Sequence, residues 1–138
     1  MPARTARIRI RSTERESAVD ITERVNEAVR GSRVPSGVCV VASAHTTAGI
    51  LINENADPDV IRDLLRRLAL IVPVDEEDRH AEGNTPAHVK AILVGASVTV
   101  PVKDGALDLG RWQGIFLADF DGPRDRTATV TVIGEVGA

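Results

Sequence analysis

Aromatic side chains are scarce in this chain, which has one Trp, two Phe and no Tyr among its 138 residues. Val, Ile, Leu and Ala must therefore fill the hydrophobic core. Cysteine is equally rare, because Cys39 has no second cysteine with which to form an intrachain disulfide. This excludes a small fold stapled by disulfides. Cys39 lies in the apolar run Val38–Val41, and we expect a buried thiol in a reducing compartment.

Long apolar segments and an excess of positive charge are also missing. No apolar stretch approaches the roughly 20 residues that cross a bilayer, and the first 30 residues contain no signal-peptide core. The chain has 17 Lys and Arg against 20 Asp and Glu, mixed along its length, for a net charge of -3. Nonspecific nucleic-acid binding needs a broad basic field. We therefore expect a cytoplasmic protein with neither a membrane nor a nucleic acid as partner.

The order of periodic segments predicts an α+β fold. The length suits a single domain covering residues 1–138. Alternation in Ala6–Arg11 predicts a half-buried strand, and the continuous apolar run Val38–Ala42 predicts a strand covered on both faces. Helices are expected from Asp20 to Gly31, from Asp57 to about Leu70, and from Asn84 to about Val94. Strands follow around residues 98–100, 107–109, 115–117 and 127–133.

The three histidines, His45, His80 and His88, are the leading candidates for a functional centre. Three neutral imidazoles that leave an open position suit a catalytic zinc. Their spacing of 35 and then eight residues matches no local metal motif, so only tertiary folding can unite them. The positive end of the third helix favours a neutral His88. The alternative is three unrelated structural residues at a strand end, in a loop and near a helix cap.

Two polar phrases precede predicted helices. Asn53–Asp57 offers side chains and free amide donors for an anion, or Asp57 simply caps the helix. Asn84 has the same two interpretations, and two flanking histidines favour a site.

Two further phrases follow in the strand-rich half. Trp112 and Gln113 stand between two glycines, where the indole is expected to cover a flat ligand ring or to pack in a tight bend. Arg124 and Arg126 follow a turn and are expected either to clamp a phosphate or to form a salt-bridged turn.

In combination, these phrases resemble the YjbQ-like family, also called the secondary thiamine-phosphate synthase family. The resemblance runs from about residue 6 to residue 135. The matching motifs are Ser43–Gly49, Asn53–Asn55, Asp57–Pro58, His80, Gly83–Asn84, Ala87–Lys90, Gly110 with Trp112–Gln113, and Asp121–Arg124 with Arg126.

The resemblance implies a fold, an assembly and a metal. The fold has two packed, mostly antiparallel sheets with about three helices, and the assembly is a homotrimer. His45, His80 and His88 would be the family's site histidines, able to hold a divalent metal, above all zinc. Arg79 stands where an aromatic residue is expected, so the pocket lining beside Asp75–Arg79 is expected to differ.

The activity implied by the resemblance is weak thiamine-phosphate synthesis. An aminopyrimidine pyrophosphate and a thiazole phosphate are joined, and pyrophosphate leaves, with magnesium as a further possible ion. The three histidines and Glu54 would be catalytic. The substrate, a small phosphorylated molecule, would contact Thr46, Asn84, Trp112, Gln113, Arg124 and Arg126.

Two other hypotheses remain beside a metal-dependent enzyme on a phosphorylated molecule. A metal-assisted hydrolase would use Glu54, Glu82 or Asp63 as the base that activates water. A noncatalytic trimeric protein would use the histidines and arginines only to hold an anion or a metal.

Overall fold

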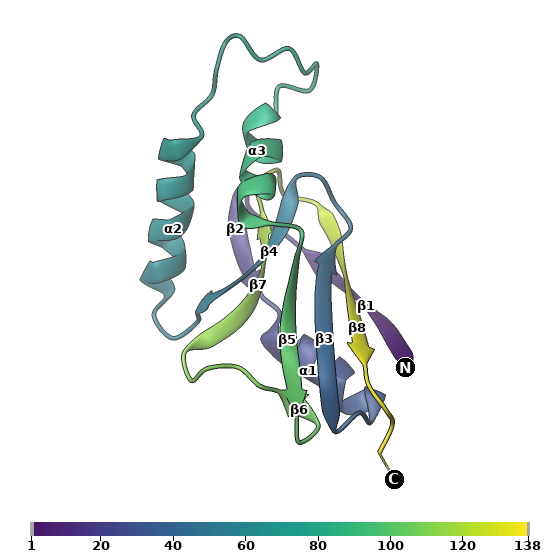
Figure 1. The fold of residues 1–138 in the computed structure, drawn as a ribbon. Helices are drawn as coiled ribbons and strands as arrows, with labels where there is room; N and C mark the ends of the chain where they lie inside the picture. Colours follow the sequence, from purple (N-terminus) through teal and green to yellow (C-terminus); the bar gives the residue numbers. More distant parts are fainter. Residues whose placement is uncertain (1, 138) are drawn as a thin grey trace.

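Two antiparallel sheets and three helices build the chain in a computed structural model that describes residues 2–137 (Figure 1). The predicted single-domain α+β fold is confirmed. One sheet has the strand order β1-β8-β3-β5-β6 and the other the order β2-β7-β4. The strands are β1 (Ala3–Arg11), β2 (Ser17–Asp20), β3 (Ser36–Ser43), β4 (Ala48–Glu54), β5 (Ser97–Lys103), β6 (Ala106–Leu107), β7 (Gln113–Asp119) and β8 (Asp125–Ile133). The helices are α1 (Thr22–Ser32), α2 (Pro58–Ile71) and α3 (Thr85–Val94).

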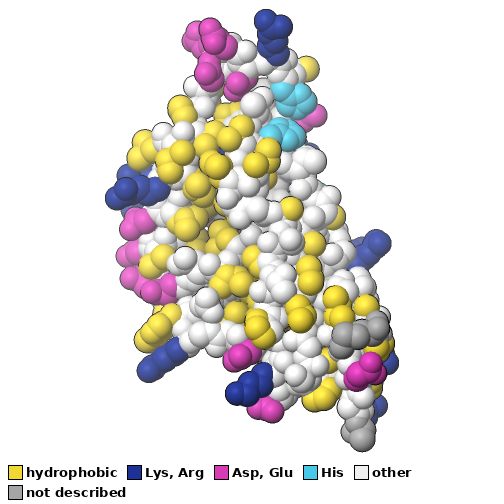
Figure 2. Space-filling view, viewed as in Figure 1, with side chains coloured by type: hydrophobic (Ala, Val, Ile, Leu, Met, Phe, Trp, Pro, Cys, Tyr) yellow, Lys and Arg dark blue, Asp and Glu magenta, His cyan; other side chains and the backbone are white. Residues whose placement is uncertain are grey.

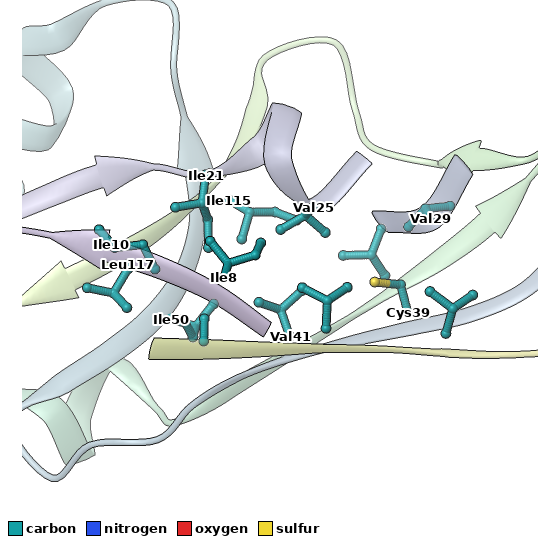
Figure 3. Close-up of a cluster of buried hydrophobic side chains, with 14 of the residues drawn as sticks. Ile8, Ile10, Ile21, Val25, Val29, Cys39, Val41, Ile50, Ile115 and Leu117 are labelled. Carbon is teal, nitrogen blue, oxygen red and sulfur yellow. The ribbon is translucent and has the colours of Figure 1, made fainter. Parts of the chain in front are cut away.

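The three-stranded sheet is covered on both faces. Along β7, Ile115 and Leu117 join the main core with the five-stranded sheet and α1. Phe116 and Ala118 belong to a second cluster with side chains of α2 and α3. Neighbouring residues of a strand point to opposite faces, so a strand between two apolar layers is buried along its whole length. Figure 3 shows part of the main core, which is filled by aliphatic side chains and Cys39, as the scarcity of aromatics predicts.

The prediction that the strand over Val38–Ala42 is covered on both faces is wrong. In β3, Cys39 and Val41 are 0% exposed, whereas Val38 is 38% exposed. The reason is that β3 lies in the five-stranded sheet, whose outer face carries exposed side chains such as Val38 and Pro101. The alternating strand is confirmed, because Ile8 and Ile10 of β1 are buried between exposed arginines.

Helix ends follow local chemistry. Asp57 caps α2, since its Oδ1 accepts from the Asp59 amide at 2.9 Å. Asp20 Oδ1 accepts from the Thr22 amide, but the N-cap residue of α1 is Ile21, which forms no side-chain cap bond, so the helix starts one residue later than predicted. The predicted end at Gly31 is wrong, because α1 continues to Ser32 and ends where Arg33 adopts a left-handed φ of 61°. No helix of residues 2–137 is long and apolar enough to span a membrane.

The strand β4 matters most for the site, and it is not among the strands expected from the sequence. β3 and β4 follow each other in the chain but belong to different sheets. Residues 44–47, which include His45, therefore carry the chain from one sheet to the other at one end of the sheets (Figure 1).

Candidate functional site

The three histidines line one pocket of about 330 Å³. His45 comes from the loop between β3 and β4, His80 from the loop before α3, and His88 from α3 itself. The tertiary fold thus unites residues that the sequence separates, as the site hypothesis requires. The full lining consists of His45, Thr46, Thr47, His80, Glu82, Asn84, His88, Asp121, Arg124 and Arg126.

His80 and His88 are in direct contact. Their rings meet edge to face, with centroids 5.3 Å apart and planes at 83°. His80 is exposed and His88 is half-buried. Figure 2 shows histidine side chains at the surface, next to the acidic loop at the top of the molecule. This pair forms the open edge of the pocket, where solvent and small molecules have access.

His45 is held differently. Its Nε2 accepts a hydrogen bond from the Thr127 amide at 2.8 Å, which places the proton of the neutral ring on Nδ1. Its own amide donates to Ser43 Oγ at 3.1 Å. Burial lowers the pKa of His45 below 6.5, and the positive charge of Arg126 lowers it further. At neutral pH the ring is therefore an oriented, uncharged imidazole with an N–H to donate.

A buried ion pair lies beneath the pocket. Arg126 donates from Nε to one oxygen of Asp119 at 2.9 Å and from Nη2 to the other at 2.6 Å. Ser12 Oγ donates to the same carboxylate at 2.6 Å. Burial alone would raise the pKa of Asp119, but these hydrogen bonds outweigh it and lower the pKa. The carboxylate is 0% exposed and stays ionised, so it fixes Arg126 in place.

Arg124 forms the second pair of this turn. Its Nε donates to the Asp121 carbonyl at 2.8 Å and its Nη2 to Asp121 Oδ2 at 3.1 Å. The salt-bridged turn proposed from the sequence as the alternative to a phosphate clamp is therefore present. Within residues 2–137, the hydrogen bonds of both arginines use Nε and Nη2, which leaves Nη1 of each guanidinium for a ligand.

Asn84 belongs to both the helix and the pocket. It is the N-cap residue of α3, as predicted, but its side chain forms no cap bond and lines the pocket instead. Its Nδ2 donates to Asp121 Oδ2 at 2.7 Å, which identifies the other atom as the amide oxygen. That Oδ1 is buried and has no hydrogen-bond partner within residues 2–137. A buried acceptor without a partner is costly, so a ligand donor would be favoured there.

Several residues of the site were missed by the sequence analysis. Asp119 and Asp121 stand in the same phrase as the arginines, and that alternation of opposite charges was the available signal. Lys90 Nζ contacts both carboxylate oxygens of Glu16 at 3.1 Å and lies 5.7 Å from the Phe120 ring centre. Lys90 is only 5% exposed and anchors α3 behind the pocket. No sequence signal connects it with Glu16, 74 residues away.

Three predicted site residues lie at the opposite end of the three-stranded sheet. In the register of β4 and β7, Ala48 pairs with Asp119 and Glu54 pairs with Gln113. Six residues of strand at about 3.3 Å each separate these ends by roughly 20 Å. Glu54 and Gln113 therefore do not meet the histidines within one chain, and neither does the adjacent Trp112.

These three residues have local roles instead. Glu54 Oε2 accepts from the Asp57 amide at 3.1 Å, and Gln113 Oε1 accepts from the Gly110 amide at 2.8 Å. Trp112 is 56% exposed, and the Arg111 guanidinium lies 4.8 Å from its ring. Within one chain, Glu54, Gln113 and Trp112 thus lie in turns at the far end of the sheet and not in the histidine pocket.

The expected three-histidine zinc centre does not fit this side-chain arrangement. Within residues 2–137, no group of three or more His, Cys, Asp or Glu side chains lies in a geometry that holds a metal ion. His45 Nε2 is already the acceptor for the Thr127 amide, which leaves only Nδ1 as a ligand from that ring. Cys39 is buried in the core, where burial raises its pKa to about 11.

The fold and the pocket define the class: an α+β domain of two packed antiparallel sheets with a histidine-lined polar pocket at one end. The sequence matches the family described as UPF0047 protein YjbQ-like over residues 6–135, and the chain belongs to this family. It is 48% identical to the UPF0047 protein YugU of Bacillus subtilis, over 92% of this chain and 97% of that protein. A UPF0047 protein of Methanocaldococcus jannaschii is also 48% identical, over 91% of each chain.

Solved structures share the fold. A YjbQ/UPF0047 protein of Clostridium acetobutylicum superposes with a TM-score of 0.90 at 46% identity, over 93% of this chain and 99% of that one. A protein of unknown function from Sulfolobus solfataricus superposes with a TM-score of 0.93 at 33% identity, over 97% and 99%. These comparisons establish the family and the fold, and none names a reaction.

Proposed function

We propose that the protein is an enzyme that acts on a small phosphorylated molecule in the histidine-lined pocket. The observation that carries the proposal is the convergence of His45, His80 and His88 with two arginines that each present a free Nη1. Guanidinium N–H groups suit phosphate oxygens. A neutral imidazole suits proton transfer. Together they favour phosphate binding next to a proton donor or acceptor.

His45 would be the central catalytic residue. Its neutral ring is oriented by the Thr127 amide and carries the proton on Nδ1. Such an N–H stabilises negative charge that develops on a substrate oxygen, without the cost of reorienting water. His88 and His80 at the open edge would exchange protons with the leaving or entering group. Arg124 and Arg126 would neutralise phosphate charge through Nη1.

Thiamine-phosphate synthesis is the reaction that the family resemblance suggests. A pyrophosphate leaving group would gain most from the two Nη1 groups, because negative charge builds on it as the bond to carbon breaks. The new bond would join the aminopyrimidine methyl carbon to the thiazole nitrogen. Elemental analysis of the purified protein would detect zinc, or magnesium that binds together with the pyrophosphate.

Hydrolysis is a second candidate, favoured by the position of one carboxylate. Glu82, which stands between His80 and Asn84 in the sequence, also lines the pocket. Glu54 and Asp63, the other two predicted bases, do not line it. Turnover of a phosphoester without any pyrophosphate co-substrate would select this reaction. Anion binding without turnover of either kind would select the noncatalytic binding protein.

Phosphate binding is tested by Arg124→Gln, because this side chain is 52% exposed and its loss spares the core. Calorimetry should show that the variant binds inorganic pyrophosphate at least about tenfold more weakly than the wild type, as expected for one lost charge-assisted hydrogen bond. Trp112→Ala at the far end of β7 is the matched control and should stay within about twofold of the wild type. Equal affinities in all three proteins would refute the anion site.

A homotrimer is part of the proposal and rests on exposed apolar side chains. Leu70 and Ile71 of α2 are each 67% exposed, and Val74 is 85% exposed. Figure 2 shows apolar side chains gathered over α2. Patches of this kind mark association surfaces.

Light scattering should give three times the 14.7 kDa chain mass. A monomer mass would exclude the trimer. We also assign the protein to the cytoplasm within this proposal, on the ground that its one cysteine is a free, buried thiol.

A further inference from the structure

A second, apolar cavity opens beside the polar pocket. It has a volume of about 470 Å³ and shares His45, Thr46 and His88 with the polar pocket. The rest of its lining is aliphatic and consists of Ala48, Ala91, Ile92 and Ala96. The two histidines therefore stand at the junction between a polar and an apolar space, where a reacting bond would lie.

Backbone hydrogen bonds join the elements that line the apolar cavity. The Gly95 carbonyl accepts from the Ile50 amide at 3.0 Å, and the Ala96 carbonyl accepts from the Ser43 amide at 2.8 Å. A Cβ at Gly49 would lie 2.6 Å from the Gly95 oxygen, so glycine permits this close approach of α3 to β4. With the backbone fixed on both sides, the alanine side chains leave space that they do not fill.

We propose that the substrate is a phosphate or pyrophosphate ester of a compact apolar group, whose apolar part occupies the cavity formed by Ala48, Ala91, Ile92 and Ala96. This inference rests on the proposed function, because the phosphate is placed in the polar pocket. The combined space falls within the usual range for small-molecule sites, roughly 300–1,000 Å³.

The buried oxygen of Asn84 adds a requirement for the polar part of the ligand. Its Oδ1 has no partner within the described residues, whereas Nδ2 is fixed on Asp121. A ligand N–H or O–H at this position would satisfy it. The substrate class is therefore an ester with an anionic end, a hydrogen-bond donor close to that end, and an apolar body beyond the histidines.

Two probes test the apolar cavity: inorganic phosphate and phenyl phosphate, each titrated by calorimetry. Phenyl phosphate should bind the wild type at least about tenfold more tightly than inorganic phosphate does, because its ring leaves water. Ala96→Leu fills the cavity from an exposed position, and Ile92→Ser removes its apolar wall. Both variants should bring the ratio of affinities close to one and leave the affinity for inorganic phosphate within about twofold.

Leu93→Ser is the matched control. Leu93 is the neighbour of Ile92 on α3, is 56% exposed and does not line the cavity. It should keep the full preference for phenyl phosphate. An equal loss in Leu93→Ser and Ile92→Ser would show that this face serves association between copies and would overturn the inference.

A wild type without preference for phenyl phosphate would also overturn it. If inorganic phosphate itself fails to bind the wild type, the proposed function fails, which is a separate outcome.

Discussion

Asparagine in place of Asp119 is expected to lower the free energy of unfolding by about 3–5 kcal/mol. The carboxylate is 0% exposed and accepts hydrogen bonds from Arg126 and from Ser12. The substitution keeps the shape of the side chain but leaves the guanidinium, which is 4% exposed, without its counter-charge. Urea denaturation of the wild type and the variant measures the difference.

Asp125→Asn is the control for this result. Asp125 pairs with Arg11 at 3.4 Å on the surface, where the two side chains are 90% and 60% exposed. Exposed ion pairs contribute at most about 1 kcal/mol. If Asp119→Asn is no more destabilising than Asp125→Asn, the ion pair is not the support that the geometry indicates.

The sign of the pH dependence follows from the lowered pKa of Asp119. Burial would raise that pKa, but the hydrogen bonds from Arg126 and Ser12 lower it below 3.8 in the folded protein. The folded state thus binds a proton less readily than the unfolded state. The stabilisation is present above the unfolded value and is lost as the pH falls through the folded value.

Glutamine in place of His45 is expected to reduce turnover by about 10²–10⁴-fold, the usual contribution of a positioned acid or base. Glutamine retains an oxygen that can accept from the Thr127 amide, so the loop should keep its conformation. The assay follows pyrophosphate release from the aminopyrimidine and thiazole substrates. Turnover within about threefold of the wild type would remove His45 from the chemistry.

A stability measurement separates this catalytic role from a structural one. Because the pKa of His45 is lowered by burial and by Arg126, the unfolded state takes up a proton more readily. Wild-type stability should therefore decline as the pH falls below about 6.5, the ordinary histidine value. In His45→Gln this part of the decline should disappear. Trp112→Ala, distant from the pocket, should change neither turnover nor this pH dependence.

Local chemistry made much of the fold predictable. Asp57 with Pro58 predicts the start of α2, and the structure has that cap. The alternation of Ile8 and Ile10 with arginines predicts β1 and its buried face. The strand β4 was not predicted, although it begins with a continuous apolar run and is buried on both faces over Ala48–Leu51. Which strand receives a cover on both faces depends on the packing of distant helices, which no local window contains.

The site was predictable as a set of residues more than as a geometry. His45, His80, His88 and Asn84 do line one pocket. Trp112 was grouped with them because it belongs to the same family pattern. The register of β4 against β7 places it at the other end of the sheet. The number of residues between Trp112 and the histidines does not say at which end of the sheet each of them will lie.

By itself, the sequence determined an aliphatic core, a single α+β domain, membership of the YjbQ-like family and three histidines as the candidate centre. Only the tertiary structure decided how those residues are used. It directs both arginine forks to Asp119 and Asp121, turns His45 Nε2 towards a backbone amide, and opens an apolar cavity beside His88. The physical reason is that hydrogen bonds and ion pairs between distant segments form according to three-dimensional distance, which the order of residues along the chain does not specify.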